Sequence, residues 1–93
     1  MYTATSKLDL LLRESFSLKE KRRIVRSIIE RLKSRFNISV AEVGHLKALR
    51  RTALGVALVS NEMAHLEEVM EKVVKFVEAD SRVQIIDLAK EIY

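Results

Sequence analysis

A run of cationic side chains marks the residues best suited to chemistry in this sequence. The segment from Ser17 to Arg26 reads SLKEKRRIVR and holds five basic residues and one acidic residue. Guanidinium and ammonium groups bind phosphates and carboxylates. The start of a helix carries a partial positive charge, so cations placed there are disfavoured unless an anion lies opposite them. The run therefore predicts a surface for an anionic partner.

Helical spacing gathers most of these cations on one flank. At about 100° per residue, Lys19, Arg22 and Arg26 form a stripe with the later Lys33 that only Glu30 interrupts. Lys21 falls close to the apolar face and is expected to project over the end of a sheet. A second basic group occupies the connection between two predicted strands, where Lys47 adds to the charge. The residues that we predict to bind nucleic acid are Lys19, Lys21, Arg22, Arg26, Lys33, Arg50 and Arg51.

The kind of nucleic acid follows from what the strands lack. Stacking of bases on a sheet requires exposed aromatic residues on the central strands, and the predicted strands offer only Tyr2 near one end. A Gly-x-x-Gly clamp is also absent. Contacts from Lys and Arg to phosphates give affinity and salt dependence with little readout of bases. We therefore predict structured RNA or a ribosomal subunit as the partner, rather than a single strand.

No catalytic constellation is recognisable. The chain has no cysteine, and its two histidines, His45 and His65, lie twenty residues apart without a third metal ligand at a known spacing. We predict a non-enzymatic protein with no catalytic residues, no metal and no cofactor. An enzyme would have to use Lys21, Glu42 and His45 as convergent polar groups near a sheet edge, without a recognisable nucleophile or base.

Hydrophobic periodicity predicts one domain, residues 1–93, with the order β-α-β-β-α-β. A strand over 2–13 alternates apolar and polar residues, and Ser17 with Glu20 forms a capping box before a helix that Asn37 ends. Strands over 38–46 and 52–59 form a hairpin, Ser60 or Asn61 caps a second helix, and a strand over 83–89 ends the domain. This order is typical of the ferredoxin-like α+β fold, a four-stranded antiparallel sheet with two helices on one face and the first and third strands at its centre.

Charge is unevenly divided between the two predicted helices. Residues 18–36 hold eight basic and two acidic residues, whereas residues 62–80 hold two basic and six acidic residues. Helices that lie side by side could neutralise one another in surface ion pairs. Alternatively, the basic face is free for an external anion. The sequence leaves both interpretations open.

Apolar residues on both faces of the third predicted strand suggest that the open face of the sheet is covered. We predict a homodimer through this face, since an uncovered apolar surface is unusual in a soluble protein. The longest apolar runs are far shorter than the roughly 20 residues that span a bilayer. We therefore expect no membrane partner, and the lack of cysteine and of a recognisable secretory segment predicts a cytoplasmic protein.

Three segments resemble the YlxP-like family of small bacterial domains of unknown function. They are Ser17–Arg23, Arg35–Val43 and Leu54–Ala57 with Val59–Asn61. The resemblance covers nearly the whole chain and implies a ferredoxin-like fold. Genes of this family often lie among those for transcription, translation initiation and ribosome maturation, which implies a role linked to RNA or ribosomes. Relatives commonly carry Trp-Gln-Arg in the hairpin connection, where this chain has Leu49-Arg50-Arg51.

The principal prediction is thus a factor that contacts RNA or ribosomal phosphates through a basic helix and a hairpin loop. The alternative is a protein-interaction or regulatory module, in which the basic stripe meets an acidic protein surface and the open sheet face meets a partner or a second copy.

Overall fold

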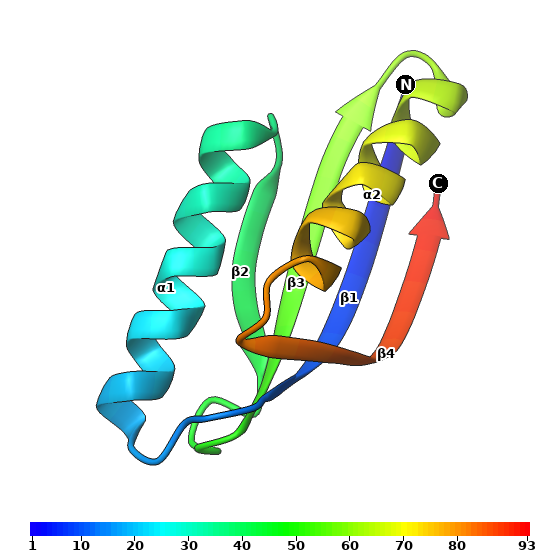
Figure 1. Cartoon of the computed structure of the whole chain (residues 1–93). Coiled ribbons are helices and arrows are strands. Elements are labelled where there is room, and N and C mark those ends of the chain that lie inside the picture. The colour runs from blue at the N-terminus through cyan, green and yellow to red at the C-terminus, as the bar shows by residue number, and fades with distance from the viewer.

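The computed structural model describes all 93 residues and contains six regular elements (Figure 1). They are β1 (Tyr2–Leu12), α1 (Leu18–Arg35), β2 (Ser39–Gly44), β3 (Arg51–Ser60), α2 (Met63–Glu78) and β4 (Val83–Ile92). The strands form one antiparallel sheet in the order β2-β3-β1-β4, with β1 and β3 at the centre. Both helices cover the same face of the sheet. The predicted ferredoxin-like α+β fold is confirmed.

The core lies between the sheet and the two helices. Alternation along β1 points Leu8, Leu10 and Leu12 into it, and none of the three is exposed. From the helices, Leu32 of α1 and Val73 of α2 are equally buried. Removing these apolar side chains from water is the main force that holds each helix on the sheet. The outward side of α1 is consequently left to its polar residues.

The predicted N-terminus of α1 is confirmed, and its predicted C-terminus is wrong by one residue. Ser17 is the N-cap, and its hydroxyl oxygen accepts a hydrogen bond of 3.1 Å from the Glu20 N–H. The Glu20 carboxylate accepts from the Phe16 N–H at 3.0 Å and so secures the turn before the helix. The C-cap is Phe36 rather than Asn37, because Phe36 is already extended while its N–H still donates to the Leu32 carbonyl.

The hairpin strands also differ from their predicted bounds. β2 ends at Gly44 instead of residue 46, after a register shift, and His45 adopts a left-handed conformation with φ of 56°. The carbonyl oxygens of His45 and Leu46 accept hydrogen bonds from the Lys21 ammonium instead of from a neighbouring strand. The His45 carbonyl also accepts from the Ala48 N–H at 3.1 Å, so the chain turns here and the ladder stops early.

The second half of the chain differs in two details. The N-cap of α2 is Glu62, so the prediction of Ser60 or Asn61 is wrong, although the Ser60 hydroxyl accepts a bond of 3.1 Å from the Glu62 N–H. β4 continues to Ile92, three residues beyond its predicted end, because it pairs with β1 along most of its length. Neither α1 nor α2 is long and apolar enough to cross a bilayer.

Candidate nucleic-acid interface

One side of α1 presents cations to solvent without any acidic partner. All of these side chains are exposed, and none forms an ion pair within the chain. The helix beneath them is held rigidly, because its opposite side is buried against the sheet. We call this surface the outer basic face; it consists of Lys19, Arg22, Arg23, Arg26 and Lys33.

The outer basic face points away from the acidic helix. Arg22 and Arg31 are nine residues apart, which places them on opposite sides of α1 at about 100° per residue. Arg31 is directed towards Asp80, just beyond α2, with 4.0 Å between its Nη1 and the Asp80 Oδ2. The outer face therefore lies on the far side of α1 from α2.

Two of the glutamates of α2 are paired within their own helix. Glu68 contacts Lys72 at 2.9 Å and Glu71 contacts Lys75 at 3.5 Å. The hydrogen bond and charge of Lys72 lower the pKa of the Glu68 carboxyl. The sequence left open whether the basic and acidic helices neutralise one another in ion pairs. The structure shows only one such contact, the long one between Arg31 and Asp80. The cations of the outer basic face form no ion pair, although Glu30 lies among them.

The prediction that Lys21 binds nucleic acid is wrong, because its side chain is buried. Its side chain is 1% exposed, and its ammonium contacts the Glu42 Oε2 at 2.9 Å, the His45 carbonyl at 2.7 Å and the Leu46 carbonyl at 3.1 Å. Glu42 also accepts a bond of 2.6 Å from the Thr52 hydroxyl. All three protons of the ammonium group therefore have partners inside the protein, and no phosphate can reach it.

The polar trio considered for an enzyme is only partly assembled. Lys21 and Glu42 are in contact, but His45 joins them through its backbone carbonyl. The imidazole of His45 faces Asp9 instead, with 3.5 Å between Nε2 and Oδ1. No group of three or more His, Asp or Glu residues is placed to hold a metal ion.

Arg50 and Arg51 lie in and beside the β2–β3 connection, at the same end of the molecule as the N-terminus of α1 (Figure 1). The Arg50 guanidinium donates to the carbonyl oxygens of Leu12 at 3.2 Å and Arg13 at 2.8 Å, and so ties the connection to the end of β1. Arg51 is half-buried, and its Nε is buried without a hydrogen-bond partner. Arg50 is thus the more exposed of the two arginines, but its guanidinium already forms these hydrogen bonds within the protein.

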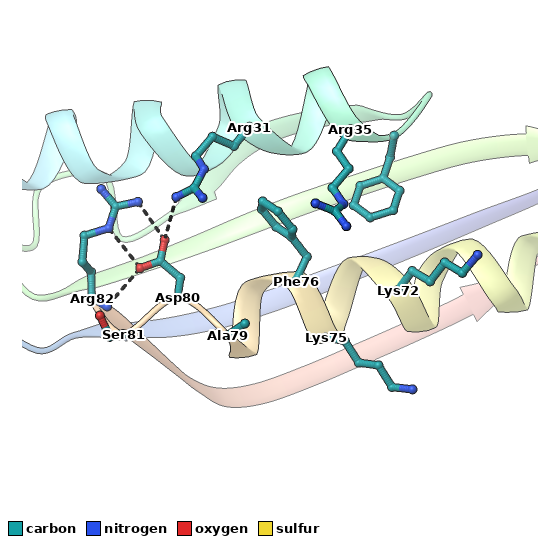
Figure 2. A pocket seen from close by; sticks show the side chains of 10 residues that line it. Arg31, Arg35, Lys72, Lys75, Phe76, Ala79, Asp80, Ser81 and Arg82 are labelled. Atoms are coloured by element: carbon teal, nitrogen blue, oxygen red, sulfur yellow. Dashed lines mark hydrogen bonds and ion pairs between the residues drawn. The ribbon is translucent and has the colours of Figure 1, made fainter.

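A second basic feature was not predicted from the sequence: a groove between the C-terminal halves of α1 and α2 (Figure 2). Its volume is about 770 Å³. We call it the interhelical groove; its lining residues are Arg31, Arg35, Phe36, Lys72, Lys75, Phe76, Ala79, Asp80, Ser81 and Arg82.

Aromatic rings form the apolar part of this groove. The guanidinium carbon of Arg31 lies 5.6 Å from the centre of the Phe76 ring, and that of Arg35 lies 5.4 Å from it. Phe36 meets Phe76 edge to face, with 6.1 Å between ring centres. Both phenylalanines are partly buried and also pack against the core. The only signal in the sequence was the arginine pair at a spacing of four, next to Phe36.

The carboxylate of Asp80 is bound by its neighbour Arg82. Asp80 accepts from the Arg82 Nε and backbone N–H, each at 3.0 Å, and from the Arg82 Nη2 at 2.7 Å. These hydrogen bonds, with the charges of Arg82 and Arg31, lower the pKa of Asp80 against the opposing effect of burial. Arg82 also donates to the Ser27 hydroxyl at 3.2 Å and links the start of β4 to α1.

Comparisons with known proteins place the chain within a family but give it no activity. The model of the family described as "Protein of unknown function (DUF503)" matches residues 3–90. The "Uncharacterized protein YlxP" of Bacillus subtilis (strain 168) is 31% identical over 71 residues, which are 76% of this chain and 77% of that protein.

Two solved structures are similar in fold. The structural-genomics protein YJCS superimposes with a TM-score of 0.61 and 14% identity over 96% of both chains. LarC2, the C-terminal domain of a cyclometallase, gives a TM-score of 0.47 and 9% identity over all of this chain and 55% of that one. The first likeness concerns the fold alone, and the second is too low to support an argument.

Proposed function

This chain belongs to the DUF503 family, whose function is unknown, and we propose that it binds structured RNA through the outer basic face. The RNA is either free or part of a ribosomal subunit. Arg50, at the same end of the molecule as the N-terminus of α1, is a further contact.

The observation that supports this proposal is the set of exposed, unpaired cations on a rigid helix. Fourteen residues separate Lys19 from Lys33, which corresponds to about 21 Å along the helix axis. A straight row of charges of this length suits the phosphates of a folded RNA, which is recognised chiefly by its shape and backbone. Arg22 and Arg26 repel one another at a spacing of four, and a bound phosphate would relieve that repulsion.

We propose a binding factor rather than an enzyme. Phosphate contacts of this kind need charge and position but no general acid, base or nucleophile. The most convergent polar groups, Lys21 and Glu42, satisfy one another and the backbone around them, as expected of a structural contact.

The test is a binding titration across a salt series. Fluorescence anisotropy would follow a labelled RNA hairpin, and sedimentation would follow small ribosomal subunits. The variant Arg22→Ala with Arg26→Ala removes two cations from the outer basic face. Its matched control, Lys7→Ala with Lys90→Ala, removes two exposed cations from the sheet.

We expect the affinity of the wild type to fall steeply with salt. The slope of log K against log salt should decrease by about 1.4 to 1.8 in the α1 variant, since each lost phosphate contact contributes about 0.7 to 0.9, and should stay unchanged in the control. Equal effects of the two variants, or no binding of either RNA at low salt, would refute the proposal. If association with ribosomal subunits persists after RNase treatment, the outer basic face binds an acidic protein surface, as in the alternative of a protein-interaction module.

A further inference from the structure

The interhelical groove combines positive charge with aromatic rings, and we propose that it binds a nucleotide, with its phosphate on Arg31 and Arg35 and its base in the apolar corner between Phe36 and Phe76. This site is separate from the outer basic face, since Arg31 and Arg22 lie on opposite sides of α1. The nucleotide is either free or an unpaired unit of an RNA strand.

The size of the groove fits such a ligand. Its volume of about 770 Å³ lies within the range of about 300 to 1,000 Å³ that is usual for small-molecule sites. Figure 2 shows that α1, α2 and the connection to β4 all contribute side chains to it. Three elements held by one core line this groove, whereas the outer basic face belongs to a single helix.

The charges in the groove favour an anion. Five basic side chains line it against a single carboxylate, Asp80, and Asp80 is already bound by Arg82 through both of its oxygens. Arg35 has no ion pair, and Arg31 has only its contact of 4.0 Å. Like charges at a spacing of four destabilise a helix slightly, and a phosphate between them would reverse this effect.

Two lysines can add to this charge when a ligand binds. Lys72 and Lys75 also line the groove, and their ion-pair partners are the exposed glutamates one turn earlier. Exposed pairs of this type contribute little to stability. Breaking either pair when a ligand binds would therefore cost little stability.

The aromatic residues explain why a nucleotide fits better than a simple anion. Both guanidinium groups lie over the Phe76 ring, which orients them while their N–H groups stay free to donate to phosphate. Phe36 stands perpendicular to Phe76 and leaves an apolar corner. Bases stack on aromatic rings and on guanidinium planes alike. Arginine stems could also simply cover Phe76, and the experiment separates this arrangement from a binding site.

The first experiment records amide chemical shifts of the full chain during titration with adenosine monophosphate, ribose 5-phosphate, adenosine or inorganic phosphate. The groove variant is Arg31→Gln with Arg35→Gln. Its matched control, Arg22→Gln with Arg26→Gln, changes two arginines at the same spacing on the opposite side of the same helix. Phe76→Leu removes the ring but keeps apolar volume, and circular dichroism verifies that each variant is folded.

We expect adenosine monophosphate to bind at least about fivefold more tightly than ribose 5-phosphate or inorganic phosphate, because stacking of one base supplies this much or more. The shifts should centre on Phe36, Phe76 and Arg82. The groove variant should lose this binding, and the control should keep it. Equal binding of the nucleotide and phosphate, shifts elsewhere, or equal loss in both variants would overturn the proposal.

The second experiment identifies the source of the nucleotide. One RNA hairpin carries a single bulged 2-aminopurine, and another is fully paired. A preference of the wild type for the bulged RNA that the groove variant loses supports an unpaired RNA unit, whereas binding of the free nucleotide without that preference supports a free ligand. The absence of both overturns the inference. Both hairpins have a paired stem for the outer basic face to bind, so the difference between their affinities reports on the groove, and the affinity for the fully paired hairpin reports on the outer basic face.

Discussion

Replacement of Lys21 by methionine should destabilise the fold and leave RNA binding intact. Lys21 is 1% exposed and bonded to Glu42 and to two carbonyl oxygens. Methionine keeps most of the apolar stem but removes the charge and all three hydrogen bonds. The Glu42 carboxylate would remain and would keep only its hydrogen bond from the Thr52 hydroxyl. The substitution therefore leaves one charge without its counterion and the Leu46 carbonyl without its donor, whereas the His45 carbonyl still accepts from the Ala48 N–H at 3.1 Å.

The size of the effect follows from these contacts. Loss of one partner of a buried ion pair costs about 3 to 5 kcal/mol. The Glu42 side chain retains 20% exposure, so water stabilises it in part, and we expect the lower limit of about 3 kcal/mol. In a domain of this size, that loss corresponds to a decrease in Tm of roughly 12 to 24 °C.

Urea denaturation followed by circular dichroism would measure the free energy of unfolding, and RNA anisotropy would measure binding below the transition. Arg22→Ala is the control, because it should leave stability within about 0.5 kcal/mol of the wild type and weaken RNA binding. Adding Glu42→Leu to Lys21→Met should recover part of the loss, since it removes the unpaired charge. A Lys21→Met protein as stable as the wild type, or one that is folded but binds RNA as weakly as Arg22→Ala, would refute this account of Lys21.

Three further predictions concern a cap, a titrating pair and the open sheet face. Ser17→Ala should lower the free energy of unfolding by about 1 kcal/mol and Ser17→Gly by less, because only the serine hydroxyl accepts from the Glu20 N–H; thermal denaturation would measure both. The pKa of Asp80 is lowered in the folded state, so its stabilising contribution is present above its unfolded value of about 3.9 and disappears as pH falls through the lower folded value. Asp80→Asn should therefore cost about 1 kcal/mol near pH 7 and nothing at strongly acidic pH, which denaturation at a series of pH values would show. Ala57→Lys, opposite Thr5 and Ser39 on the open sheet face, should convert the predicted homodimer to monomer in sedimentation equilibrium, and a wild type that is monomeric at micromolar concentration would contradict that prediction.

The fold was predictable because its signals are local. The alternation of β1, the Ser17 cap and the periodic apolar residues of the helices each depend on residues close together in the chain. The order of these elements then leaves few topologies open. The end of β2 was not predictable in this way, because the Lys21 ammonium, more than twenty residues earlier, takes the carbonyls of His45 and Leu46.

The outer basic face depends on residues close together in the chain, whereas the interhelical groove depends on residues that only folding brings together. Helical periodicity alone places Arg22, Arg26 and Lys33 on one flank, so the sequence determined the outer basic face without knowledge of the rest of the molecule. It could not show that Lys21 is withdrawn into the protein, because the partner Glu42 belongs to another element. The interhelical groove exists only in the folded chain: packing brings Arg31 and Arg35 of α1 next to Phe76 of α2 and to the connection before β4. Spacing along the chain encodes a surface on one helix, whereas a cavity between helices is decided by how their buried sides pack on the sheet.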